Sequence, residues 1–203
     1  MGFDLTLFSI SEKANFVLEK AKLDKNYAND FDKIQDTDDL ILHLRMIQSN
    51  PDETPENILK ELIEDSKAVL SHYPDSNIKK YQFYSQTRGY ETLNYLLIAY
   101  LKSKKINIDD NKVFFGGKDI INNTQYQSFQ YLDNFKTMEI SNLLQMIDFS
   151  DIVKFYNYKK LENSVYKLTR PENLVYLKVE FEDLKTFFHE AKKLNAFVII
   201  KIN

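Results

Sequence analysis

Cysteine is absent from this sequence of 203 residues. A chain without cysteine has no disulfide framework, no thiolate metal site, no iron–sulfur cluster and no cysteine nucleophile. A domain of this size buries roughly 70% of the surface that its unfolded chain exposes, so a hydrophobic core can stabilise it without such crosslinks. We therefore expect a protein of the reducing cytoplasm that needs no cofactor.

Glycine and proline are scarce, with four of each in the whole chain. These residues commonly mark turns and linkers, and the chain has no linker rich in proline, glycine or serine, no low-complexity tract and no internal repeat. Two polar stretches, 71–80 and 107–123, are the best candidates for a boundary. We expect a single domain that spans residues 1–203.

Positive charge is limited as well. The net charge is −3, and arginine occurs only at Arg45, Arg88 and Arg170. This balance gives little attraction to nucleic acid or to anionic lipid. No apolar run approaches the ~20 residues that span a bilayer, and the N-terminus lacks the basic flank of a signal peptide. We expect neither nucleic acid nor a membrane as a partner.

Most of the chain shows helical patterning after a short N-terminal strand. Residues 3–8 alternate apolar and polar side chains, as a half-buried strand does. Ser9 and Glu12 have the spacing of a capping box and predict a helix over 11–22. Further helices are predicted where a capping residue precedes apolar residues at helical spacing, which occurs at Asp36 or Thr37, Thr54, Thr137 and Ser150.

The middle of the chain contains the most apolar predicted helix. Residues 90–102 are apolar on nearly every face, which is typical of a helix at the centre of its domain. Residues 113–115 read as a short strand. Gly116 and Gly117 follow it, and we expect them to form a tight turn that needs positive φ.

The clearest pattern lies near the C-terminus. Apolar residues from Leu174 to Ala191 step by three and four, which predicts one long helix with a capping box at Thr169 and Glu172. An alternating strand over 175–181 is the competing interpretation, and we favour the helix. Asn195 suits the end of the helix.

Residues 196–200 carry no charge and are rich in β-branched side chains, so they predict a strand that is covered on both faces. Together with the alternating N-terminal segment, this strand completes the prediction of architecture. The fold class is α+β: a helix-rich domain with a small sheet that includes the N-terminal and C-terminal strands.

Several segments together resemble a known family. The chain starts with Met1-Gly2 running into a strand, has an aromatic-led helix at 90–97 and a Phe-Phe-Gly-Gly turn at 114–117, and ends with residues 181–191 before an apolar strand. Val165 follows a further helix. This order resembles the YfbM-like family of uncharacterised bacterial proteins, over most of the chain. The resemblance implies a compact cytoplasmic α+β domain, and it brings no catalytic residues.

Catalytic and metal-binding signatures are missing from the sequence. The Gly116-Gly117-Lys118 run lacks the spacing of a P-loop, and no serine lies in a GxSxG frame. The histidines are scattered and form neither HExxH nor HxH pairs. The acidic clusters at 36–39 and 109–110 suit a helix start and a turn. We expect no catalytic, cofactor or metal site.

One segment has the composition of a recognition surface. Residues 81–90 combine tyrosine, glutamine and arginine, and residues 126–131 repeat the tyrosine and glutamine pattern. Such side chains are common in protein interfaces and in sugar or nucleoside pockets. The alternative is that these tyrosines only bury their rings at the domain edge. The predicted partner-binding residues are Tyr81, Tyr84, Arg88, Tyr90, Tyr126 and Tyr131.

Two functions are consistent with these features. The first is a non-catalytic domain that binds another protein, for example an immunity-type domain that neutralises a toxin. The second is a small-molecule binder or enzyme whose pocket lies near Arg88, Tyr90 and Gly116-Gly117. A flat aromatic or acidic face favours the first, and a deep cleft with perturbed titratable groups favours the second.

The predicted C-terminal strand gives a direct test. Removing residues 196–203 takes away several buried side chains, each contributing ~1.5–3 kcal/mol, and their sum exceeds the stability of a typical domain. We expect a chain that ends at Asn195 to lose its cooperative thermal transition. A truncated chain that stays soluble and melts cooperatively would show that the strand is not central.

Overall fold

A computed structural model of the protein describes residues 4–10, 82–85, 87–107, 112–124, 127–165 and 167–202. These residues all belong to one compact unit, which combines Met1–Glu12 with Gln82–Asn203. The segment Lys13–Tyr81 lies outside the described residues. The helices predicted after Asp36 or Thr37 and after Thr54 fall in that segment, and the single domain over 1–203 stays a prediction.

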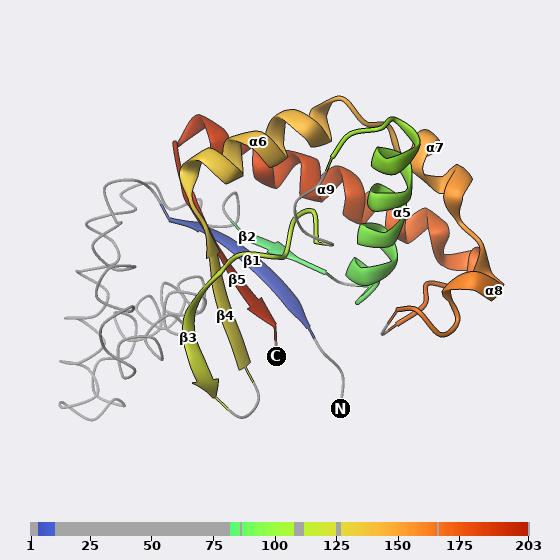
Figure 1. Ribbon diagram of the computed structural model, residues 1–203, viewed down its shortest axis with the longest axis horizontal. Coiled ribbons are helices and arrows are strands. Elements are labelled where there is room, and N and C mark those ends of the chain that lie inside the picture. The colour runs from blue at the N-terminus through green and yellow to red at the C-terminus, as the bar shows by residue number, and fades with distance from the viewer. Residues whose placement is uncertain are drawn as a thin grey trace, which may run out of the picture. The chain divides into compact units, whose positions relative to one another are not determined.

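A five-stranded antiparallel sheet organises the described residues (Figure 1). Its strand order is β2-β1-β5-β4-β3, so the first and last strands of the chain pair at its centre. The strands are β1 (Leu5–Ile10), β2 (Gln82–Tyr84), β3 (Lys118–Thr124), β4 (Gln127–Leu132) and β5 (Phe197–Ile202). This confirms the predicted α+β class with both terminal strands in one sheet.

Strand β5 is buried on both faces, as the uncharged run 196–200 predicts. Val198 and Ile200 belong to the hydrophobic core, and Ile199 and Lys201, which alternate with them, are buried too. β5 pairs with β1 on one side, from Leu5 opposite Ile202 to Ile10 opposite Phe197, and with β4 on the other.

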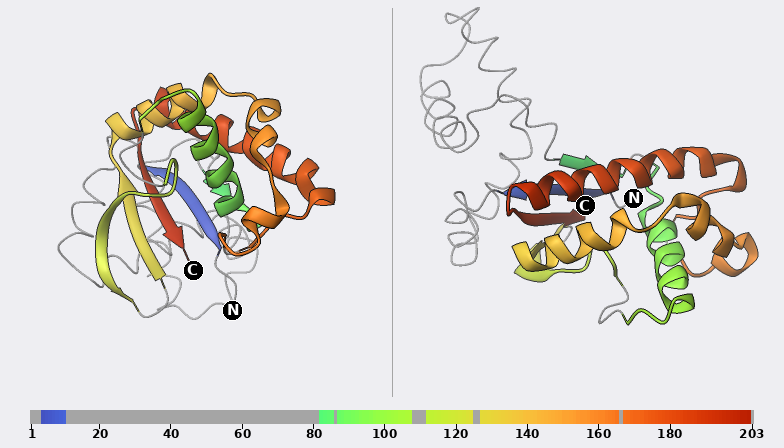
Figure 2. Two further views of the ribbon diagram at one scale, coloured as in Figure 1. Left: turned by 45° about the vertical axis from the view of Figure 1, so that its right-hand side comes forward. Right: turned by 90° about the horizontal axis from the view of Figure 1, so that it is seen from above.

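The helices gather on one side of the sheet. Among the described residues they are α5 (Tyr90–Ser103), α6 (Asn134–Gln145), α7 (Phe149–Ile152), α8 (Tyr158–Leu161) and α9 (Leu174–Lys193), with short 3-10 turns η4 (Val153–Phe155) and η5 (Pro171–Asn173). Helices α6 and α9 run side by side over one face of the sheet, as the view from above shows (Figure 2). Helix α5 packs against α7 and η4. These helices and the sheet enclose one core.

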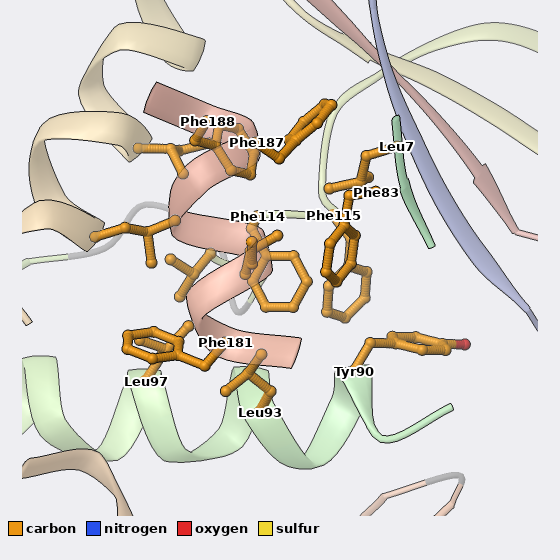
Figure 3. Packing of buried hydrophobic residues seen from close by; sticks show 14 of the residues in the cluster. Leu7, Phe83, Tyr90, Leu93, Leu97, Phe114, Phe115, Phe181, Phe187 and Phe188 are labelled. Atoms are coloured by element: carbon orange, nitrogen blue, oxygen red, sulfur yellow. The ribbon is translucent and has the colours of Figure 1, made fainter. Parts of the chain in front are cut away.

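Helix α9 confirms the long C-terminal helix and excludes the competing strand. Leu177, Phe181, Leu184 and Phe188 are fully buried, and Val179 between them is 56% exposed. Figure 3 shows the cluster that they join, with Leu93 and Leu97 of α5 and Phe114 of a loop among its members. Asn195, with φ of 51°, ends the helix as predicted. No helix in the described part of the chain combines the length and apolar character that crossing a bilayer requires.

Residues 113–115 are not the short strand that their apolar run predicts. They form a bend, and all three side chains are buried. The ring of Phe115 meets the rings of Phe114 and Tyr90 edge-on, with centroids 5.2 and 5.3 Å away. The run is apolar because it fills the core beside α5, and a short apolar run does not reveal the backbone conformation.

The predicted positive-φ turn at Gly116 and Gly117 is also wrong, because neither glycine has positive φ. The reason for glycine at 117 is space: a Cβ there would lie 2.5 Å from the backbone oxygen of Tyr131. Strand β3 begins at Lys118, inside the polar stretch 107–123 that the sequence marks as a candidate boundary. Because the sequence of β3 is mostly polar, it has little hydrophobic pattern from which its hairpin with β4 could be predicted.

Helices start at residues other than the predicted capping residues. Ser9 pairs with Val198 inside β1, and the helix predicted over 11–22 lies outside the described residues. The side chain of Asp133, and not Thr137, caps α6 by accepting from the Lys136 N–H at 2.9 Å, and this bond lowers the pKa of Asp133. Asp148, in place of Ser150, precedes α7, and no capping box forms at Thr169, whose region leads into η5.

The buried stripe of α9 predicts a large difference between neighbouring positions. Phe181→Ala leaves a cavity in the core, so we expect a loss of about 3–5 kcal/mol in the free energy of unfolding. Val179→Ala, on the exposed face of the same helix, should change it by less than ~0.5 kcal/mol. Urea denaturation of both variants measures the difference, and equal losses would contradict the assigned face of α9.

Candidate functional site

A groove with a volume of about 450 Å³ opens between strand β2, the first half of α9 and the segment 167–169. We call it the Tyr84 groove. The loop from β2 to α5 provides one wall and α9 provides the other. The side chains that matter for its chemistry are those of Tyr84, Thr87, Lys167, Tyr176, Glu180 and Asp183.

Glu180 forms the floor of the groove. Its side chain is 4% exposed, and its carboxylate accepts hydrogen bonds from the Ser85 hydroxyl, the Thr87 hydroxyl and the Thr87 N–H, the last at 3.2 Å. Helix α9 places Glu180 beside the buried face that Phe181 and Leu184 occupy. None of its three donors is charged, and no lysine or arginine of the described residues forms an ion pair with it.

The backbone of the β2–α5 loop is fixed by short-range contacts. The Arg88 N–H donates to the Ser85 carbonyl at 3.1 Å, and the Gly89 N–H donates to the Thr87 hydroxyl at 2.9 Å. A Cβ on Gly89 would lie 2.4 Å from the hydroxyl oxygen of Thr169, so glycine is required where this loop meets that segment. The loop therefore presents Thr87 to Glu180 in one conformation.

Arg88 is used inside the chain. Its guanidinium forms an ion pair with Asp4, and one of its nitrogens, Nη2, donates to Asp4 Oδ2 at 3.2 Å. The charge of Asp4 raises the pKa of Arg88 above its ordinary value. The residue has φ of 55°, the left-handed region. The ion pair of Arg88 with Asp4 therefore joins the β2–α5 loop to the residue that precedes β1.

The predicted partner-binding residues fall in different places. Tyr84 is 45% exposed and lines the groove, four residues before Arg88. Tyr90 is 2% exposed and packs against Phe115 in the core. Tyr131 lies on β4, which the two strands β1 and β5 separate from β2, and the Lys118 ammonium lies 5.9 Å from its ring centre. Tyr81 and Tyr126 lie outside the described residues.

The pocket suggested near Arg88, Tyr90 and Gly116-Gly117 does not coincide with the Tyr84 groove, which none of these residues lines. Nor do they line a second groove of about 310 Å³ beside α6, whose walls include Ile106, Lys112, Glu139 and Met146. Tyr90 does lie near the glycine pair through its contact with Phe115. Arg88 is turned to Asp4.

Tyr176, Glu180 and Asp183 line the groove but were not among the site residues predicted from the sequence. A signal for Glu180 was present, because a carboxylate at this position adjoins the apolar stripe of α9. No such signal marks the other two, which become part of a groove only when β2 lies beside α9. Within the described residues, no three histidine, aspartate or glutamate side chains are grouped as a metal ion requires.

The contacts of Glu180 predict its contribution to stability. Glu180→Ala leaves the buried hydroxyl of Ser85 and the donors of Thr87 without their acceptor, so we expect a loss of about 1–3 kcal/mol in the free energy of unfolding. The matched control is Glu182→Ala, which removes an exposed carboxylate 3.9 Å from Lys185 and should cost less than ~1 kcal/mol. Thermal unfolding with equal midpoints for the two variants would contradict this role.

Comparison with known proteins places the chain in a family. No curated protein and no solved structure matches it. A family model described as "Domain of unknown function (DUF1877)" matches residues 43–201, which is more than half of the chain. The match includes β2, the β2–α5 loop and all of α9, so every wall of the Tyr84 groove lies within it. The chain therefore belongs to the DUF1877 family of domains of unknown function.

Proposed function

We propose that this DUF1877 domain is a non-catalytic protein-binding domain whose partner contacts the rim of the Tyr84 groove. The proposal rests on one observation: large apolar side chains around one groove are exposed to water. Tyr84 is 45% exposed, Val179 is 56% exposed and Tyr176 is 62% exposed. Val175, one turn before Val179, is 60% exposed.

Tyrosine at the rim of a groove is well suited to recognition. Its ring buries a large area with few rotatable bonds, and its hydroxyl bonds to polar groups, so tyrosine is common among the residues that dominate binding energy. Two tyrosines from separate elements, β2 and α9, here border a floor of polar side chains. A partner would find both an apolar rim and hydrogen-bonding groups.

The scaffold beneath this rim is already ordered by packing. Phe83, next to Tyr84, is buried and lies 6.4 Å from the ring of Phe187 on α9. Tyr176 is followed directly by the fully buried Leu177. Because the backbone on both sides is anchored, little conformational freedom is lost when a partner binds, which favours affinity.

We extend the proposal to the setting of the protein. The absence of cysteine and the resemblance to the YfbM-like family support a bacterial cytoplasmic protein. An immunity-type role, in which the partner is a toxin, suits a small acidic domain with a net charge of −3.

A second candidate function is the binding of a small molecule. The volume of the Tyr84 groove, about 450 Å³, lies within the range of ~300–1,000 Å³ that is common for ligand pockets. Polar groups of Thr87, Glu180 and Asp183 line it beside the tyrosine rings. This candidate pocket differs from the one suggested near Arg88, Tyr90 and Gly116-Gly117, because none of these residues lines it.

Substitution of the two rim tyrosines tests the proposed function. The protein and its variants are used to capture partners from the native host, and a captured protein is then purified and titrated by calorimetry. We expect Tyr84→Ala and Tyr176→Ala each to weaken its binding by about tenfold or more, because hot-spot tyrosines contribute above ~1.4 kcal/mol. The midpoint of thermal unfolding should be nearly unchanged for both.

Tyr158→Ala is the matched control, because Tyr158 is 38% exposed on α8 and does not line the groove. It should bind the captured protein as the unchanged chain does. Full affinity of both rim variants would contradict the proposal. A small molecule that co-purifies with the unchanged chain and is lost from the rim variants, without any captured protein, would favour the second candidate.

A further inference from the structure

We propose that the Tyr84 groove receives a basic side chain, lysine or arginine, from the protein partner. This inference rests on the proposed function and names the chemistry of the group that enters the groove. Three features support it: the hydrogen bonds of Glu180, the charges along the walls of the groove and the two exposed tyrosine rings at its rim.

The first argument is the uncompensated charge of the floor. Glu180 is 4% exposed, and among the described residues only hydroxyl and amide groups donate to its carboxylate. A carboxylate in such a place is stabilised when a cation approaches, because removal from water weakens screening of the attraction. The three donors also keep its orientation, so a cation that enters the groove meets a carboxylate already in position.

The second argument is the balance of charge along the walls. Asp183 lies three residues after Glu180, on the same side of α9, and is exposed to water in the groove. Lys167 is the cation among the lining residues, and it forms no ion pair with either carboxylate. Within the described lining, two carboxylates therefore face one ammonium group.

The neighbouring arginines do not alter this balance. Arg88 is paired with Asp4, and Arg170 lies 4.0 Å from Glu172. Counted over the described residues that line it, the groove has a net negative charge, which is complementary to a basic group and repels an acidic one.

The third argument is the nature of the rim. Tyr84 and Tyr176 are exposed and line the same groove as the two carboxylates. The faces of tyrosine rings attract ammonium and guanidinium groups, and the long aliphatic stem of lysine or arginine packs on apolar surface such as Val179. Aromatic rim, apolar wall and anionic floor each match a different part of one basic side chain.

Short peptide probes test this inference without the partner. Acetylated and amidated Gly-Arg-Gly, Gly-Lys-Gly, Gly-norleucine-Gly and Gly-Glu-Gly are titrated into the ¹⁵N-labelled full chain, and backbone amide shifts are recorded. We expect the two basic probes to shift the amides of Thr87, Tyr176 and Glu180 in a saturable way. The norleucine probe, which has a similar stem without charge, should bind at least about fivefold more weakly, and the glutamate probe should not bind.

Charge-removing variants identify the carboxylates. Asp183→Asn should weaken the basic probes by about two- to fivefold, as expected for an exposed ion pair, and Glu180→Gln by more, because its carboxylate is buried. Asp148→Asn is the control, since Asp148 is an exposed carboxylate that does not line the groove. Asp183→Asn alone keeps the test valid should Glu180→Gln unfold, because Asp183 is exposed and forms no hydrogen bond or ion pair within the described residues.

The outcomes separate this inference from the proposed function. Equal shifts with the arginine, lysine and norleucine probes, or none with the basic ones, would overturn the inference, even where the rim tyrosines prove necessary for a protein partner. Basic probes that bind with the expected dependence on Asp183 would support it. A captured protein that binds without the rim tyrosines would refute the proposed function, and the probe titrations would still decide separately whether the groove accepts a basic side chain.

Discussion

The pairing of β1 with β5 is the constraint on which the rest of the described structure depends. Six residues of each strand lie opposite one another, and β2 and β4 then extend the sheet on either side. Helix α9 leads into β5 through the turn at Asn195, so its register over the sheet follows from that of β5. Strand β2, held by β1, carries Tyr84. The two walls of the Tyr84 groove are thus positioned by one pair of strands.

The elements with a strong hydrophobic pattern could be predicted from the sequence. Helix α9 and strand β1 present apolar residues with one clear period, whereas α5 and β5 are apolar on nearly every face, and burial in a common core accounts for both patterns. The hairpin of β3 and β4 could not be predicted, because β3 is mostly polar and is held by backbone pairing with its neighbour. The bend at 113–115 was misread because packing alone decides its conformation.

The candidate site was predicted only in part, for a related reason. Tyr84 belongs to a segment whose composition stands out, and it does line the groove. Tyr176 and Asp183 are ordinary exposed residues of an amphipathic helix, and only the approach of β2 to α9 gives them a shared groove. Arg88 was predicted to bind a partner partly because arginine is rare in this chain. Its guanidinium binds Asp4, and its role toward a partner stays a prediction. The scarcity of arginine indicated that the guanidinium of Arg88 has a role, but it did not indicate which role.

The central position of β5 determines when the sheet can be completed during synthesis. Its two partners lie on opposite sides of it in the sheet but both precede it in the sequence, and β1 is separated from it by almost the whole chain. During synthesis β1 emerges first and must wait, unpaired on that edge, until β5 has left the ribosome. Contacts this distant in sequence close slowly, since a long loop must be ordered before they form. The nascent protein is therefore expected to complete its sheet only after translation has passed β5, with an exposed strand edge until that moment.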